Sequence, residues 1–152
     1  MVSLLGTTIG GLFNCEHLHF ESIKLPAILA ESTSMRGDVL FRNGFESKGM
    51  VRLYAARIGG NLECDGAHFI NPEGISIHAE RAQVNGYVFL RGGFHSDGSV
   101  RLTGITVGSN LVCSGAQFIS KQGVALDLTH SVIGETLRVT IVTFPVLRQR
   151  PF

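Results

Sequence analysis

The sequence has no tryptophan, only four prolines and a small share of charged residues, 16%. Charged residues usually make up about 25% of a soluble chain, and long-helix folds are richer still in Glu, Lys and Ala. The low charge therefore argues against a coiled coil or helix bundle. Thirteen basic residues nearly balance twelve acidic ones, so nothing in the charge balance favours nucleic acid or an anionic membrane surface as a partner.

Long hydrophobic runs are also missing. No apolar stretch approaches the ~20 residues that a membrane-spanning helix needs, and residues 1–6 lack the basic leader of a secretory signal. We therefore expect no membrane span. The chain has only three cysteines, an odd number far apart in the sequence, which is typical of reduced thiols and favours a cytoplasmic location.

Glycine, by contrast, is abundant, with 19 residues in a chain of 152. This is well above the usual share of roughly 7%. Because 44% of the residues are hydrophobic and the net charge is only +1, disorder is not expected. The length suits a single domain.

A repeat of 49 residues runs through most of the chain. It separates Cys15, Cys64 and Cys113, and the same offset superimposes Ile9-Gly10-Gly11 on Ile58-Gly59-Gly60. Each repeat divides into two similar halves, because phenylalanines recur in steps of 24 or 25 residues. These are Phe20, Phe45, Phe69, Phe94 and Phe118. The chain therefore consists of six similar units, and a period of this length indicates a solenoid.

Within one unit, apolar residues alternate with polar ones over short stretches such as Val51-x-Leu53 and Leu62-x-Cys64. Alternation of this kind is typical of strands with one buried face, and no unit holds a sustained helical pattern. We predict an all-β fold, a right-handed parallel β-helix of about six coils with three short strands per coil. It should span residues 1–144, followed by a C-terminal tail or cap at 145–152. The phenylalanines should stack inside, and glycines should supply corners with positive φ.

The position that follows the cysteines alternates acid and base from coil to coil. It reads Glu16, Arg42, Asp65, Arg91, and then Ser114 and Thr140. We expect these side chains to point outward, where two interpretations are open. They are a set of cross-strand ion pairs that stabilises the stack, which we favour, or a polar stripe that binds a ligand or supplies catalytic acids and bases.

The cysteines themselves should face the core, in every second coil. Coils stack about 4.8 Å apart, so two coils separate these thiols by about 9.6 Å. That exceeds the ~7 Å limit between the Cα atoms of a disulfide, and the thiols cannot converge on one metal ion. We predict buried, apolar cysteines.

Two histidines, His19 and His68, are expected in one outward column, with Gly44 in the coil between them and Gln117 further on. They could share a metal ion only after rearrangement, so no metal site is predicted. The remaining histidines should lie in unrelated columns and be solvated; they are His17, His78, His95 and His130. Glycine pairs such as Gly59-Gly60 lack the G-x-G-x-x-G spacing of a dinucleotide loop, so no cofactor is predicted.

One repeat half reads Val51-Arg52-Leu53, then Ile58-Gly59-Gly60-Asn61-Leu62-x-Cys64-x-Gly66-Ala67-x-Phe69, and closely similar residues recur from Val100 onward. Over about residues 2–139 the chain resembles the repeats of bacterial proteins labelled "membrane-associated oxidoreductase". The resemblance implies β-solenoid repeats and suggests an association with oxidoreductases. It supplies no catalytic motif that could be assigned to residues of this sequence.

Three functions follow as hypotheses. The leading one is a non-enzymatic structural or binding module with an unknown protein or carbohydrate partner, which self-associates as a dimer through an uncapped solenoid end. The first alternative is a carbohydrate-active β-helix that acts on a polysaccharide through the outward stripe. The second alternative is an oxidoreductase-associated domain.

Overall fold

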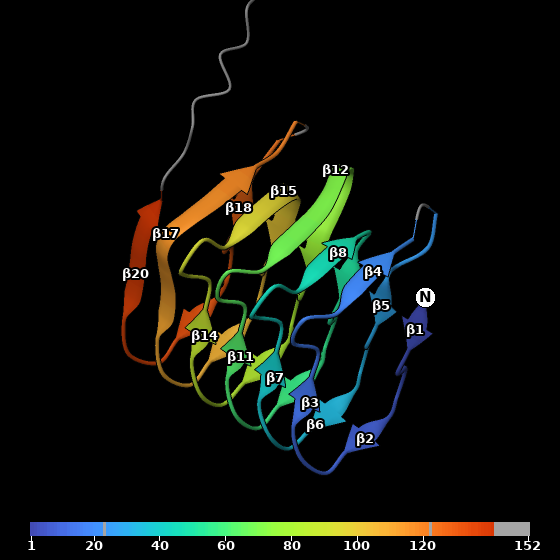
Figure 1. Cartoon of the computed structure of the whole chain (residues 1–152). Helices are drawn as coiled ribbons and strands as arrows, with labels where there is room; N and C mark the ends of the chain where they lie inside the picture. The colour runs from blue at the N-terminus through green and yellow to red at the C-terminus, as the bar shows by residue number, and fades with distance from the viewer. Residues whose placement is uncertain (23, 122, 142–152) are drawn as a thin grey trace, which may run out of the picture.

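The computed structural model describes residues 1–22, 24–121 and 123–141. Within them there is no helix, and every strand pair is parallel. The strands stack coil upon coil into a β-solenoid of about five turns (Figure 1). The predicted parallel solenoid is thus confirmed, and the number of coils is slightly lower than the six expected.

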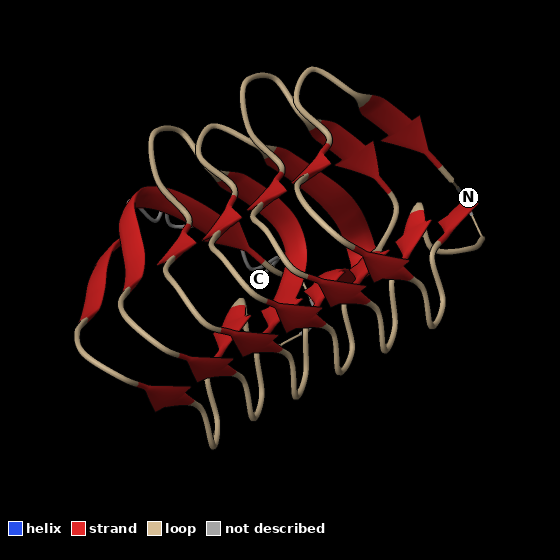
Figure 2. Cartoon of the chain, turned by 90° about the horizontal axis from the view of Figure 1, so that it is seen from below, coloured by secondary structure: helices blue, strands red, loops and turns tan. Residues whose placement is uncertain are grey.

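The first two coils are each divided into four short strands, and the later coils into about three because some of these segments are continuous there. Figure 2 shows the corners that separate the strands. Corners recur every five or six residues, so most strands are only two residues long. The first two coils contain β1 (Val2–Ser3), β2 (Thr8–Ile9), β3 (Phe13–Asn14), β4 (His19–Glu21), β5 (Ile28–Leu29), β6 (Ser34–Met35), β7 (Val39–Leu40) and β8 (Glu46–Lys48).

Later coils contain longer strands, because segments that are separate strands in the first two coils are continuous there. The longest, β12, has 11 residues. These coils contain β9 (Val51–Arg52), β10 (Arg57–Ile58), β11 (Leu62–Glu63), β12 (His68–His78), β13 (Gln83–Val84), β14 (Val88–Phe89), β15 (His95–Arg101), β16 (Thr106–Val107), β17 (Leu111–Ile119), β18 (Leu126–Asp127), β19 (Val132–Ile133) and β20 (Leu137–Ile141). The predicted tail at 145–152 lies outside the described residues.

Two outward surfaces of this solenoid matter for function. The first, which we call the stripe face, is formed by β3, β7, β11 and β14, which pair in that order. The second, which we call the groove face, is formed by the six-stranded sheet β2-β6-β10-β13-β16-β19. They meet at the glycine-rich corner that follows each strand of the groove face.

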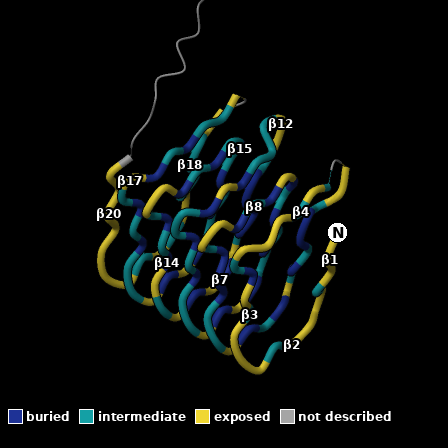
Figure 3. The backbone as a smooth tube through the Cα atoms, in the orientation of Figure 1, coloured by how far each residue is buried: buried dark blue, intermediate teal, exposed yellow. Residues whose placement is uncertain are grey.

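The core runs along the solenoid axis, and the buried residues that form it come from successive coils (Figure 3). The predicted phenylalanine stack is confirmed. Neighbouring ring centroids are 6.0 Å apart for Phe20–Phe45, 5.3 Å for Phe45–Phe69, 5.7 Å for Phe69–Phe94 and 5.4 Å for Phe94–Phe118. Four of the five rings, Phe45, Phe69, Phe94 and Phe118, are buried, and burial of this apolar column stabilises the stack along the axis.

The backbone register of this stack differs from a simple column. Phe69 pairs with Ser47 on one side and Ser96 on the other, while Phe45 and Phe94 project from the corner two residues earlier. Both serines are fully buried, and their hydroxyls donate to the carbonyls of nearby glycines at 3.1 and 2.9 Å. The alternation leaves room for one ring per coil without overpacking.

The glycines have two different roles. Some corners have positive φ as predicted, although other residues also adopt it, including Ala55 (φ 54°) and Arg81 (φ 57°). The pairs Gly10-Gly11 and Gly59-Gly60 do not adopt positive φ. A Cβ added at Gly59 would overlap the carbonyl oxygen of Arg36 in the preceding coil. Close approach of successive coils, and not positive φ, therefore requires glycine there.

Candidate functional site: a paired stripe of charges

The stripe lies where the sequence placed it. Cys15 donates its N–H to Leu40 O at 2.9 Å and Cys64 donates to Phe89 O at 2.8 Å, which stacks the cysteine column coil upon coil. Successive residues of a strand point to opposite faces, so the residue after each cysteine points outward. Accordingly the side chains of Glu16 and Asp65 are 20% and 29% exposed.

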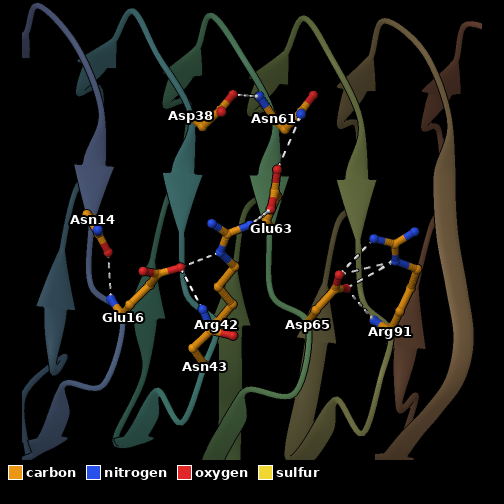
Figure 4. A network of polar contacts seen from close by, with 9 residues as sticks. All are labelled: Asn14, Glu16, Asp38, Arg42, Asn43, Asn61, Glu63, Asp65 and Arg91. Atoms are coloured by element: carbon orange, nitrogen blue, oxygen red, sulfur yellow. Dashed lines mark hydrogen bonds and ion pairs between the residues drawn. The ribbon is translucent and has the colours of Figure 1, made fainter.

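Arg42 sits at the centre of the first group of charges (Figure 4). Its Nε donates to the Glu16 carboxylate in the preceding coil, and its other arm donates to Glu63 in the following coil. Asn43 Nδ2 adds a bond to Glu16 Oε1 at 2.9 Å, and the backbone N–H of Glu16 donates to Asn14 Oδ1 at 2.8 Å. One guanidinium therefore links three coils through two carboxylates.

This arrangement has a direct electrostatic result. The hydrogen bond from Arg42 lowers the pKa of Glu16 below its ordinary value, and the same bond raises the pKa of Arg42. A general acid needs a pKa raised toward neutrality. The environment of Glu16 acts in the opposite direction.

Asp65 and Arg91 form a separate pair further along the stripe. Arg91 donates to both carboxylate oxygens of Asp65, at 2.8 Å to Oδ2 and 3.2 Å to Oδ1, and its backbone N–H donates to Oδ1 at 3.1 Å. The guanidinium lies 3.8 Å from the centroid of the Phe89 ring, which stacks on Tyr87. The stripe thus consists of two paired clusters, Arg42 with two carboxylates and Arg91 with Asp65, and each cluster joins neighbouring coils.

A second charged cluster, not anticipated from the sequence, surrounds His78. This histidine was expected in solvent, yet it is 7% exposed and that expectation is wrong. Its Nδ1 lies 2.7 Å from an Arg52 nitrogen, its Nε2 faces Glu80, and Arg52 Nε donates to Glu31 at 2.8 Å. Because arginine only donates, Nδ1 accepts and Nε2–H donates to Glu80. Both imidazole nitrogens are occupied, which leaves none for a substrate.

The predicted histidine column needs a correction. Strand pairing places Glu46 and not Gly44 between His19 and His68. The expectation counted 25 residues per half-repeat, whereas the coils here differ by 27 and 22 residues at this strand. Unequal corner lengths shift the register by two residues.

His95 belongs to the same column, directly beside His68, so the prediction that it lies in an unrelated column is also wrong. The two ring centroids are 5.6 Å apart, and His95 Nδ1 lies 3.0 Å from Gln117 Oε1. Across the described ranges, no group of three or more His, Cys, Asp or Glu side chains is arranged to hold a metal ion.

The cysteines are buried as predicted, each at most 2% exposed. Burial raises the pKa of Cys15 to about 11 and that of Cys113 to about 12, and it raises the pKa of Cys64 well above its ordinary value. The thiolate is the nucleophilic form of cysteine. These thiols therefore stay protonated and unreactive near neutral pH.

Fold and site together define a β-solenoid whose stripe face has its arginines paired with carboxylates of neighbouring coils. No part of the described chain forms a helix that could cross a membrane. Comparison with family models, with curated protein sequences and with solved structures finds no match to this chain. The resemblance to the "membrane-associated oxidoreductase" repeats stays a prediction.

Proposed function

We propose that this β-solenoid is a non-enzymatic structural and binding module. The proposal rests on the pairing of the stripe. Glu16 and Asp65, the carboxylates that a catalytic interpretation requires, are each held by an arginine from the next coil. Paired in this way they connect coils, which favours stabilisation over proton transfer.

The rival hypothesis, a carbohydrate-active β-helix, is tested on the same residues. We expect the purified protein to cleave none of a panel of acidic polysaccharides. We also expect Asp65→Asn to lower thermal stability slightly, because Arg91 loses its charged partner. Polysaccharide cleavage that disappears in Asp65→Asn would overturn the proposal and assign chemistry to the stripe.

The second alternative, an oxidoreductase-associated domain, has a simple optical test. A bound flavin or haem absorbs visible light, so an absorbance spectrum of the purified protein detects either group. We expect no absorbance above background between roughly 350 and 600 nm, where these chromophores absorb. A flavin or haem spectrum would favour the oxidoreductase hypothesis. Measuring nicotinamide binding by fluorescence extends the test to a colourless cofactor.

Self-association is part of the proposal. On the first coil, Leu5, Leu12 and Leu18 are 60%, 51% and 44% exposed, and β1, β2 and β3 each pair with one neighbouring strand. Exposed apolar side chains beside open strand edges favour pairing with a second copy, and two-fold dimers are the commonest closed assembly.

Light scattering on dilute protein tests this part. A dimer mass is expected for the native chain, and Leu12→Glu should shift it toward the monomer. Val124→Glu, also at an exposed apolar position (60%) but near the other end of the solenoid, is the matched control and should leave the dimer intact. A monomer at all concentrations would refute self-association.

A further inference from the structure

The groove face contains a depression that none of the functions considered so far has used. It lies across β6, β10 and β13 and has a volume of about 350 Å³. Its side wall is a row of three residues that pair in register from coil to coil: Ser34, Arg57 and Gln83. The volume is in the range of small-molecule sites, roughly 300–1,000 Å³.

The hollow is produced by glycine at its floor. Gly59 lies between Arg36 of the preceding coil and Asn85 of the following coil. Backbone hydrogen bonds hold this row together: Gly59 N–H donates to Met35 O, and Asn85 N–H donates to Ile58 O. Because a Cβ at Gly59 would overlap the Arg36 carbonyl oxygen, no side chain can fill this position without a backbone shift. The equivalent positions in other coils are also glycines, namely Gly10, Gly108 and Gly134. Arg36 and Asn85 are the departures from this pattern, and both line the depression.

Two arginines of the groove have no partner. Within the described residues, Arg36 and Arg57 make no ion pair and no side-chain hydrogen bond, and no Asp or Glu lines the depression. On the stripe face, by contrast, Arg42 and Arg91 are each bound to a carboxylate. Guanidinium groups present a planar set of donors that matches carboxylate and phosphate oxygens. The groove therefore has an uncompensated positive charge directed at solvent.

The other polar side chains add a second requirement. Ser34, Gln83 and Asn85 offer hydroxyl and amide groups, which both donate and accept hydrogen bonds. No aromatic ring lines the depression. The lining thus suits a polar body with hydroxyl groups better than an apolar one.

We propose that this groove binds an oxyanion attached to a hydroxylated body, as in an acidic sugar or a sugar phosphate. Arg36 and Arg57 bind the oxyanion, and the hydroxyl and amide side chains bind the hydroxyl groups beside it. The inference rests on the proposed binding function and names the site and the ligand class.

Backbone amide NMR of the full chain tests the inference directly. The probes are galacturonate, glucose 6-phosphate, inorganic phosphate and, as the neutral control, glucose. We expect at least one of the two charged sugars to shift the amides at 34–36, 57–59 and 83–85, and to bind more tightly than inorganic phosphate. Glucose should cause no shift there. The two charged sugars distinguish a carboxylate from a phosphate ligand.

Variants separate the groove from general attraction between charges. Arg36→Gln and Arg57→Gln should each weaken the binding about ten-fold or more, as expected for a lost hydrogen bond to a charged group. Arg138→Gln removes the same charge from exposed β20, at the far end of the solenoid. This variant should weaken binding by less than about two-fold, because only a long-range attraction that salt screens is lost. Circular dichroism confirms that each variant is folded.

Three results would overturn the inference: no groove shift with either charged sugar, equal binding of glucose, or equal weakening by Arg138→Gln. None of them would affect the proposed non-enzymatic function, which fails only on turnover or a bound redox cofactor. Conversely, polysaccharide cleavage would overturn that function whether or not the groove binds its probe.

Discussion

The stripe face and the groove face are built by the same repeat, yet their arginines have opposite roles. Arg42 and Arg91 on the stripe face meet carboxylates in the adjacent coil, whereas Arg57 on the groove face lies between Ser34 and Gln83. In a stack of parallel coils, the neighbours of a side chain are the residues one coil before and after it. The residue found at that offset decides whether an arginine joins coils or remains available to a ligand.

The first test concerns the core beneath both faces and has the largest expected effect. Phe69→Ala should lower the free energy of unfolding by about 3–5 kcal/mol, because its ring packs between Phe45 and Phe94. Phe89→Ala, which removes an outward ring under Arg91, is the control and should lower it by about 1 kcal/mol. Urea denaturation measures both. Equal losses of unfolding free energy in the two variants would show that the axial phenylalanine stack does not stabilise the fold more than an outward ring does.

Alkaline pH tests the buried thiols behind the stripe face. Burial raises the pKa of Cys113 to about 12 in the folded protein, whereas an exposed thiol in the unfolded chain ionises near pH 8.5. The stabilisation is therefore complete below about pH 8.5 and is lost as the pH rises toward the folded value, by ~1.4 kcal/mol per pH unit for each thiol. In Cys113→Ala the unfolding free energy should fall less steeply with pH over this range. An unchanged pH dependence of the unfolding free energy would contradict the raised pKa of Cys113.

Arginine substitutions test the difference between the faces themselves. Arg42→Met leaves Glu16 and Glu63 without their shared cation and should destabilise the protein by about 1 kcal/mol. Arg57→Met, on the groove face, should change stability by at most about 0.5 kcal/mol because no ion pair is lost. Thermal unfolding of the two variants provides the comparison. If both variants lose the same stability, paired arginines of the stripe face and unpaired arginines of the groove face do not differ in their contribution to stability.

The smallest effect is the titration of a single carboxyl group. Arg42 lowers the pKa of Glu16, so the stabilisation from this group is present above the ordinary glutamate value of about 4.3 and is lost as the pH falls toward the lower folded value. Carbon-detected NMR should show Glu16 titrating below its usual range. In Arg42→Met the titration should move back up, and Glu21, an exposed glutamate of β4, provides the reference. A Glu16 midpoint unaffected by Arg42→Met would disprove the assigned cause.

Much of the fold could be predicted because parallel stacking turns a sequence offset into a spatial neighbour. The 49-residue spacing of Cys15, Cys64 and Cys113 correctly placed those thiols inside and the following residues outside. The prediction was weaker where the corners differ in length. The column through His68 was misassigned for that reason.

The candidate site was predicted as a set of positions but not as a set of bonds. The alternation of acid and base correctly anticipated the contacts of Arg42 with Glu16 and of Arg91 with Asp65. It did not anticipate that Arg42 turns to Glu63 on its other side, since a long side chain can reach a carboxylate two residues away along the neighbouring strand.

The sequence by itself determined that this chain is a β-solenoid with an apolar axial core, because its hydrophobic residues recur with a strand period inside each coil and a constant spacing between coils. The tertiary structure decided which polar groups are paired. It buried His78 between Arg52 and Glu80, and it left Arg36 and Arg57 unpaired above Gly59. The physical reason is that pairing depends on side-chain reach and on corner lengths that alternate between coils, and neither follows from the period alone.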